Sequence, residues 1–224
     1  MASGATVPWT DVPAPPPRLA SLVKTMTWPQ GQVIHRIHLD SFDANEFNPG
    51  LKGNARFSPI RDASGALIPT IYGGETFDCV AMESVFHDVP FAIGLKTFAK
   101  SKLAGQIYST LTPRRDLVLA DLSNTALRGL GIRRTELIDT EKDQYPGTRA
   151  WAEAIHAACP NVEGLCWVSR QDDRARAAVL FGDRVATSDL GHAPGASAAV
   201  LDPPVYGALL ALAGQIQVNI VGSL

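Results

Sequence analysis

Five polar residues lie inside segments that are otherwise apolar, and they limit the possible folds of this chain more than any other feature. They are Arg36, Arg56, Tyr72, Glu83 and Ser169. Burying an arginine or a carboxylate without a partner is costly in free energy. We therefore expect the fold to bring the two arginines and the carboxylate to one shared polar site.

Composition narrows the classes of protein to consider. With 224 residues, 46% hydrophobic and 19% charged, the chain can bury the core of one globular domain. A net charge of -2 provides no basic field for DNA or anionic lipid, so we expect no direct contact with nucleic acid or membrane. Three cysteines without a Cys-x-x-Cys pair and no pattern of a secretory signal predict a reduced, cytoplasmic protein.

Residues 1–31 are predicted to form a proline-rich arm, followed by a compact domain over residues 32–224. The run from Val12 to Pro17 contains four prolines and cannot be a helix or a central strand. We expect this arm to be extended and to pack on the domain or on a partner. The alternative is a proline-rich ligand for an aromatic groove.

Alternating short strands and helices predict an α+β domain with mixed small sheets and flanking helices. Thr76 is a candidate N-cap for a helix whose inward face is Phe77, Val80, Ala81, Ser84 and Val85. The apolar stretch 205–221 is too short and too interrupted for a bilayer span, and it predicts a buried helix or a helix running into a final strand. The expected strands are 33–39, 55–58, 70–72, 117–122, 164–168 and 178–181, and the expected helices are 77–87, 96–103, 124–130 and 148–158.

Several common site patterns are missing from the sequence. His35 and His38 point to opposite faces of a strand, so no metal site is expected there. No Gly-x-Ser-x-Gly elbow, Gly-x-Gly-x-x-Gly loop or Walker loop is present, which argues against a Rossmann NAD site. His87 and His156 are interpreted as histidines at the surface or the edge of the core.

Each arginine and the tyrosine also have an ordinary structural interpretation. Arg36 is either an edge charge facing water or a partner for an anion. Arg56 suits a pyrophosphate, or else forms a surface salt bridge. Tyr72 precedes Gly73 and Gly74, which would leave room for a flat ligand beside its ring; otherwise it is a core tyrosine.

Glu83 and Ser169 carry similar alternatives. Glu83 is the only acidic residue in the body of its predicted helix, set among Met82, Val85 and Phe86, and is either poised by desolvation or simply faces solvent. Ser169 ends an apolar strand, where a hydroxyl displays chemistry or merely favours a turn. Trp167 is interpreted as a core residue rather than a platform for a ligand.

The order of these residues and their local contexts resemble the RES domain, a family named for its arginine, glutamate and serine. Arg56 lies in Gly-x-x-Arg-Phe-Ser, Glu83 follows Gly-Gly-Glu-Thr, and Ser169 ends Gly-Leu-Cys-Trp-Val-Ser-Arg. The resemblance is strongest over residues 33–185. Where the family usually has small residues before the glutamate, this chain has Asp-Cys-Val-Ala-Met at 78–82.

This resemblance implies a fold similar to that of ADP-ribosyltransferases and the activity of a bacterial toxin that degrades NAD+. It implies cleavage of the nicotinamide–ribose bond by hydrolysis or phosphorolysis, with NAD+ as substrate and no prosthetic group or metal. It also implies a cognate DNA-binding Xre-type antitoxin as partner and allows a homo-oligomer within that complex. The alternatives are a toxin that ADP-ribosylates a protein and a noncatalytic module that binds a nucleotide or a partner.

The resemblance also implies residue roles. Glu83, Arg56 and Tyr72 form the catalytic set, in which the carboxylate stabilises a ribose oxocarbenium-like state. Arg36 and Arg56 hold the diphosphate, Tyr72 borders the nicotinamide, and Ser169 hydrogen-bonds the NAD+.

Overall fold

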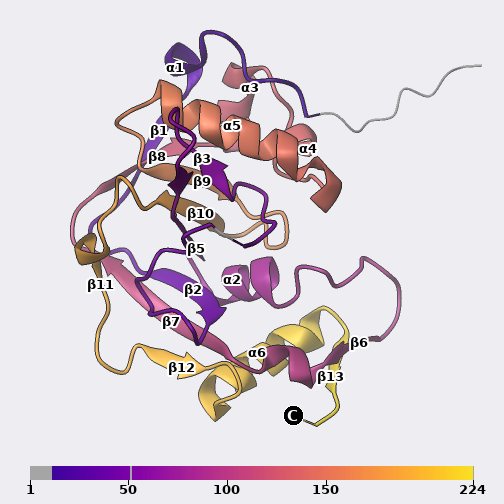
Figure 1. The fold of residues 1–224 in the computed structure, drawn as a ribbon. Helices are drawn as coiled ribbons and strands as arrows, with labels where there is room; N and C mark the ends of the chain where they lie inside the picture. The colour runs from indigo at the N-terminus through magenta and orange to yellow at the C-terminus, as the bar shows by residue number, and fades with distance from the viewer. Residues whose placement is uncertain (1–11, 51, 224) are drawn as a thin grey trace, which may run out of the picture.

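The computed structural model describes residues 12–50 and 52–223 and confirms the expected α+β class (Figure 1). Within these residues nine strands form one sheet in the order β1-β8-β9-β10-β5-β2-β7-β11, with β12 also pairing with β7. Neighbouring strands are antiparallel except for β8 and β9, which are parallel. The strands span Thr25–Trp28 (β1), Ile34–Leu39 (β2), Thr70–Gly74 (β5), Gln106–Pro113 (β7), Leu117–Asp121 (β8), Gly164–Val168 (β9), Arg176–Phe181 (β10), Leu190–Gly191 (β11) and Ser197–Ala199 (β12).

The sheet is weakest between β5 and β2. These strands share one register pair, His35 opposite Gly74, whereas β2 pairs with β7 along its whole length. Close approach at this point depends on glycine, because a Cβ at Gly73 would lie 2.4 Å from Ile34 Cγ2 and 2.8 Å from the His35 carbonyl oxygen. Gly73 therefore serves strand packing, and it also lines a cavity beside Tyr72, where the sequence predicts room for a ligand.

Two groups of helices cover different parts of the sheet (Figure 1). Around β8 and β9 the core includes Leu127, Trp151 and Leu165, and around β2 it includes Ala81, Phe98 and Leu209. The functional residues lie on elements from both regions. The first group is α1 (Leu19–Leu22), α3 (Asn124–Leu130), α4 (Arg134–Leu137) and α5 (Tyr145–Ala158); the second is α2 (Phe77–Ser84) and α6 (Pro203–Gln215), beside the parallel pair of β6 (Lys96–Ala99) and β13 (Val218–Val221).

Helix α2 begins where the sequence predicts. Thr76 caps it, its Oγ1 accepting a hydrogen bond from the Cys79 amide at 3.1 Å. The helix ends at Ser84, earlier than expected, and Ser84 itself is exposed rather than inward. The final segment is helix α6 followed by strand β13, which confirms the expectation of a helix running into a strand. The helix is not fully buried, because only one of its faces packs on the core.

Two expected elements are wrong. Residues 55–58 form a tight turn, with the Ala55 amide donating to the Ser58 carbonyl oxygen at 3.0 Å, and the nearby hairpin is instead β3 (Ile60–Arg61) with β4 (Leu67–Ile68). Residues 96–103 are strand β6 followed by a 3₁₀ turn at Lys100–Leu103 rather than a helix. Strand β6 forms because β13, more than a hundred residues later, pairs with it.

The expected proline-rich arm of residues 1–31 differs in part from the structure. Residues 1–11 lie outside the described residues. Residues 12–16 form neither helix nor strand and pack on the domain, where Trp151 Nε1 donates to the Pro13 carbonyl oxygen at 2.6 Å. Residues 19–28 supply α1 and β1, and Trp28 is fully buried, so the structured domain starts before residue 32. Among the described helices, none combines the length and apolarity needed to cross a bilayer.

Candidate active site

A cavity of about 360 Å³ opens beside β2 and β5, where the two strands diverge beyond their single register pair. Its walls come from these two strands, from α2 and the residues after it, from the turn at 54–56, and from the start of α5. Four of the five residues singled out from the sequence line it: Arg36, Arg56, Tyr72 and Glu83. The fold thus brings together the two arginines and the carboxylate.

Arg36 lies in the middle of β2, an interior strand, and is 6% exposed. Its Nη1 donates to the carbonyl oxygens of Ala44 at 2.5 Å and Glu46 at 3.1 Å. Burial lowers the pKa of the guanidinium to about 10, with Glu46 acting in the opposite direction, so the group remains charged at neutral pH. The edge-charge interpretation of Arg36 is therefore wrong.

Arg56 occupies the tight turn at 55–58 and is 4% exposed. The Thr148 hydroxyl donates to its carbonyl oxygen, and its guanidinium carbon lies 5.9 Å from the centre of the Tyr145 ring. Within the described residues it forms no ion pair, so the surface salt bridge considered above is not present.

Unpartnered hydrogen-bond donors concentrate at this cavity. Among the described residues, the buried side-chain nitrogens without a partner are Arg36 Nε, Arg56 Nε, Arg56 Nη2 and Trp167 Nε1, and all three residues line the cavity. Buried polar groups are normally hydrogen-bonded, and each one left unpaired destabilises the protein. Donors of two buried cations beside an open cavity suit an anionic ligand rich in acceptor oxygens.

Tyr72 lies on β5, and its ring and that of Trp167 form an edge-to-face pair with ring centres 6.4 Å apart. Its hydroxyl accepts a hydrogen bond from the Phe57 amide at 3.0 Å, which ties β5 to the Arg56 turn. Burial raises the pKa of the phenol to about 12. Trp167 is 2% exposed and packs on Phe57, so it is a core residue as expected, although its indole nitrogen also reaches the cavity.

Glu83 lies on the cavity side of α2, where its Oε1 accepts a hydrogen bond from the Ser169 hydroxyl at 2.7 Å. Ser169 is fully buried and does not line the cavity. Its single hydroxyl proton is engaged by Glu83, and its oxygen accepts from the Gln171 and Asp172 amides at 3.0 and 2.9 Å. In this geometry the serine orients the carboxylate and stabilises a turn, so its hydroxyl is already engaged where the resemblance implies a bond to NAD+.

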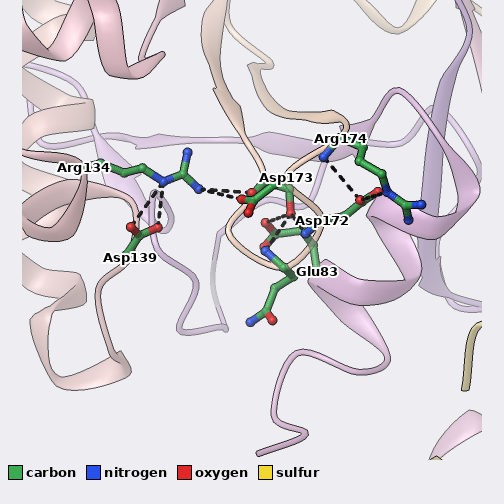
Figure 2. Close-up of polar contacts among 8 residues, drawn as sticks. Glu83, Arg134, Asp139, Asp172, Asp173 and Arg174 are labelled. Atoms are coloured by element: carbon green, nitrogen blue, oxygen red, sulfur yellow. Dashed lines mark hydrogen bonds and ion pairs between the residues drawn. The ribbon is translucent and has the colours of Figure 1, made fainter. Parts of the chain in front are cut away.

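The loop that follows Ser169 is held from both sides (Figure 2). Arg134 Nη2 donates to the Ser169 carbonyl oxygen at 3.1 Å, while its Nε pairs with Asp139 at 3.1 Å. On the opposite side Arg174 Nε pairs with Asp172 at 2.9 Å within the loop, and Arg174 Nη2 lies 3.8 Å from Asp78 Oδ2 on α2. Glu83 thus meets a hydroxyl whose position is fixed by ion pairs outside the cavity.

Sequence reasoning missed the residues at the cavity mouth. Lys142 Nζ pairs with Asp88 Oδ2 at 2.8 Å, and His87 Nδ1 lies 2.8 Å from Asp88 Oδ1. The Tyr145 hydroxyl lies 3.4 Å from His87 Nε2. No local pattern marked these residues, because Lys142 and Tyr145 join the site only through the packing of α5.

The remaining histidines have structural partners. His35 Nδ1 lies 2.6 Å from the Tyr108 hydroxyl, and His38 Nε2 lies 2.8 Å from Ser109 Oγ. His156 pairs with Asp183 at 2.8 Å at the edge of the core, as expected. In the described part of the chain no three histidine, cysteine or acidic side chains are grouped as metal ligands.

Comparison with known proteins adds a family and a fold. The model of the RES domain matches residues 33–197, well over half of the chain. A chain in the crystal structure of the M. tuberculosis MbcT-MbcA toxin-antitoxin complex is similar in fold, with a TM-score of 0.60 and 17% identity over 85% of this chain and 93% of that one. A search of curated protein sequences finds no match. The shared architecture confirms the expected fold class, similar to that of ADP-ribosyltransferases.

Proposed function

The chain belongs to the RES domain family, and on that premise we propose that it is a toxin that cleaves the bond between nicotinamide and ribose in NAD+. The observation that carries this proposal is the set of unpartnered guanidinium donors of Arg36 and Arg56 beside the cavity that also contains Glu83. A dinucleotide offers what this set lacks, because its diphosphate oxygens accept hydrogen bonds from guanidinium groups.

The reaction needs little beyond positioning and charge. As the C–N bond to the ribose breaks, its electron pair leaves with nicotinamide, which becomes neutral, and positive charge develops on the ribose. A carboxylate near the sugar stabilises that charge, and we assign this role to Glu83, held in place by Ser169. The oxygen of water or phosphate then bonds to the ribose carbon and releases its proton to solvent.

Tyr72 and the two arginines bind the rest of the NAD+ molecule. Tyr72 borders the cavity beside Trp167 and offers an aromatic edge to nicotinamide. Arg36 and Arg56 hold the diphosphate, so the ribose is presented to Glu83 rather than left free to turn. This assignment keeps Ser169 out of contact with NAD+.

A protein that drains NAD+ would poison the cell that makes it. We therefore propose a cognate antitoxin of Xre type, in line with the MbcT-MbcA structure, which is a toxin-antitoxin complex. With a net charge of -2 this chain has no basic excess for DNA contact, which leaves that contact to the partner. We expect good yields of the unmodified protein only on co-expression with that antitoxin, and harmless high-level expression alone would contradict the toxin proposal.

The test is to incubate the pure protein with NAD+ and to quantify free nicotinamide, with Glu83→Gln as the decisive variant. Glu83→Gln keeps the size of the side chain and removes its charge, so turnover should fall roughly a hundredfold or more, while NAD+ binding weakens much less. A wild-type protein that binds NAD+ stoichiometrically and leaves it intact would reject catalysis. A folded Glu83→Gln variant with near-normal turnover would remove Glu83 from the mechanism.

A further inference from the structure

The first turn of α5 holds Arg56 by two contacts that the RES resemblance does not assign. Tyr145 is 3% exposed, and the centre of its ring lies 5.9 Å from the guanidinium carbon of Arg56. Thr148 is fully buried, and its hydroxyl donates to the Arg56 carbonyl oxygen and lies 3.0 Å from the Tyr145 carbonyl oxygen. One turn of helix therefore contacts both the backbone and the charged group of Arg56.

The kind of support given to Arg56 matters for a ligand. Other buried or half-buried arginines of this protein, such as Arg134 and Arg170, pair with carboxylates. A carboxylate partner would occupy the guanidinium donors and would repel an anion. An aromatic face attracts the cation through the ring quadrupole and uses none of its N–H groups.

We propose that Tyr145 is a positioning residue for Arg56. Its ring holds the guanidinium through a cation–π contact, so that Arg56 Nε and Nη2 stay free to bind the diphosphate of the substrate. Thr148 fixes the backbone from which that side chain starts. The role of the diphosphate rests on the proposed function, whereas the contact between the ring and Arg56 does not. The Tyr145 hydroxyl, 3.4 Å from His87, is secondary to the ring in this role.

Two substitutions separate the ring from the hydroxyl. Tyr145→Leu removes the aromatic face, so the KM for NAD+ and the Kd for ADP-ribose should rise roughly 3- to 30-fold, the range of a cation–π contact from partly exposed to buried. The kcat should change much less, and inhibition by free nicotinamide should not change. Tyr145→Phe keeps the ring and should restore most of the lost affinity.

A matched control and a coupled variant complete the design. Tyr206→Leu removes a similar contact, with Lys100 Nζ 5.2 Å from the ring centre, outside the cavity, and should leave nicotinamide release unchanged. In an Arg56→Gln background, Tyr145→Leu should weaken ADP-ribose binding no further, because contacting residues are energetically coupled. If Tyr145→Leu does not fold, Tyr145→Met provides the same comparison.

The contact between the Tyr145 ring and Arg56 can also be observed directly, without an activity assay. The Arg56 Nε–H resonance should be shifted upfield by the Tyr145 ring in nuclear magnetic resonance spectra, in wild type and in Tyr145→Phe but not in Tyr145→Leu. A folded Tyr145→Leu with wild-type ADP-ribose affinity, or equal losses in the Leu and Phe variants, would overturn the proposal. If wild type binds ADP-ribose with this dependence on Tyr145 but releases no nicotinamide, the proposed reaction fails and the positioning role stands.

Discussion

The Ser169 hydroxyl makes three hydrogen bonds in a place that water does not reach, so Ser169→Ala is the most informative single change. It removes the donor to Glu83 Oε1 at 2.7 Å and the acceptor of the Gln171 and Asp172 amides. A hydrogen bond to a charged group contributes about 1.5–3 kcal/mol, and each amide left unpaired costs about 1 kcal/mol or more. The expected loss is about 3–5 kcal/mol in the free energy of unfolding, a large part of the stability of a domain.

Urea denaturation followed by tryptophan fluorescence measures this loss. The midpoint should fall at an unchanged m-value, because the amount of surface exposed on unfolding is the same. Ser84→Ala is the matched control. Ser84 is exposed on the same helix as Glu83, and among the described residues its hydroxyl bonds only to the Val80 carbonyl oxygen, so stability should change by about 0.5 kcal/mol at most.

Activity separates a positioning role from a purely structural one. At low denaturant, where Ser169→Ala is still folded, kcat should fall about tenfold or more because Glu83 loses its fixed orientation, while KM changes little. A Ser169→Ala variant as stable as Ser84→Ala, or one that is destabilised but retains full kcat, would refute the positioning role of Ser169.

Further predictions concern the cavity and the sheet. Nicotinamide release should persist in excess chelator, since the proposed step uses no metal; loss of activity that a divalent ion restores would contradict it. Assays with and without phosphate should separate phosphorolysis from hydrolysis by the appearance of ADP-ribose 1-phosphate or ADP-ribose. Because the pKa of Tyr72 is raised to about 12, its stabilising effect is complete below pH 10 and is lost as the pH rises toward 12; Tyr72→Phe should flatten that alkaline decline in unfolding midpoints. Gly164→Ala should severely destabilise the protein, because its Cβ would lie 2.2 Å from the Val179 carbonyl oxygen, and thermal melts should show it.

Local sequence signals predicted the elements whose causes are local. The cap at Thr76 and the apolar runs of β8, β9 and β10 act within a few residues, and the corresponding elements are confirmed. Strands β6 and β7 were missed because their partners are distant in the chain. Lys96–Ala99 has no strong strand pattern and becomes a strand only because β13 reaches it.

Site residues were likewise predictable where the signal is local and not where it depends on distant packing. Arg36, Arg56 and Glu83 were identifiable because a charge in an apolar segment demands a partner or a ligand. Tyr145 and Lys142 were not, since an aromatic residue or a lysine near a helix start has many ordinary uses. Ser169 was identified but its predicted contact was not, because only the structure shows that its proton is already engaged by Glu83.

The single register pair between β5 and β2 divides the sheet into two blocks that meet at this seam. One block is β1-β8-β9-β10-β5, and the other is β2 with β7, β11 and β12. Arg36 belongs to one block and Tyr72 to the other, and α2 rests on both. A ligand that touches Arg36 and Tyr72 together acts as a crosslink across this seam. Its binding energy would then resist the parting of the blocks, so the amides of β2 and β5 should exchange hydrogen more slowly in the complex, while those of β8 and β9 scarcely change.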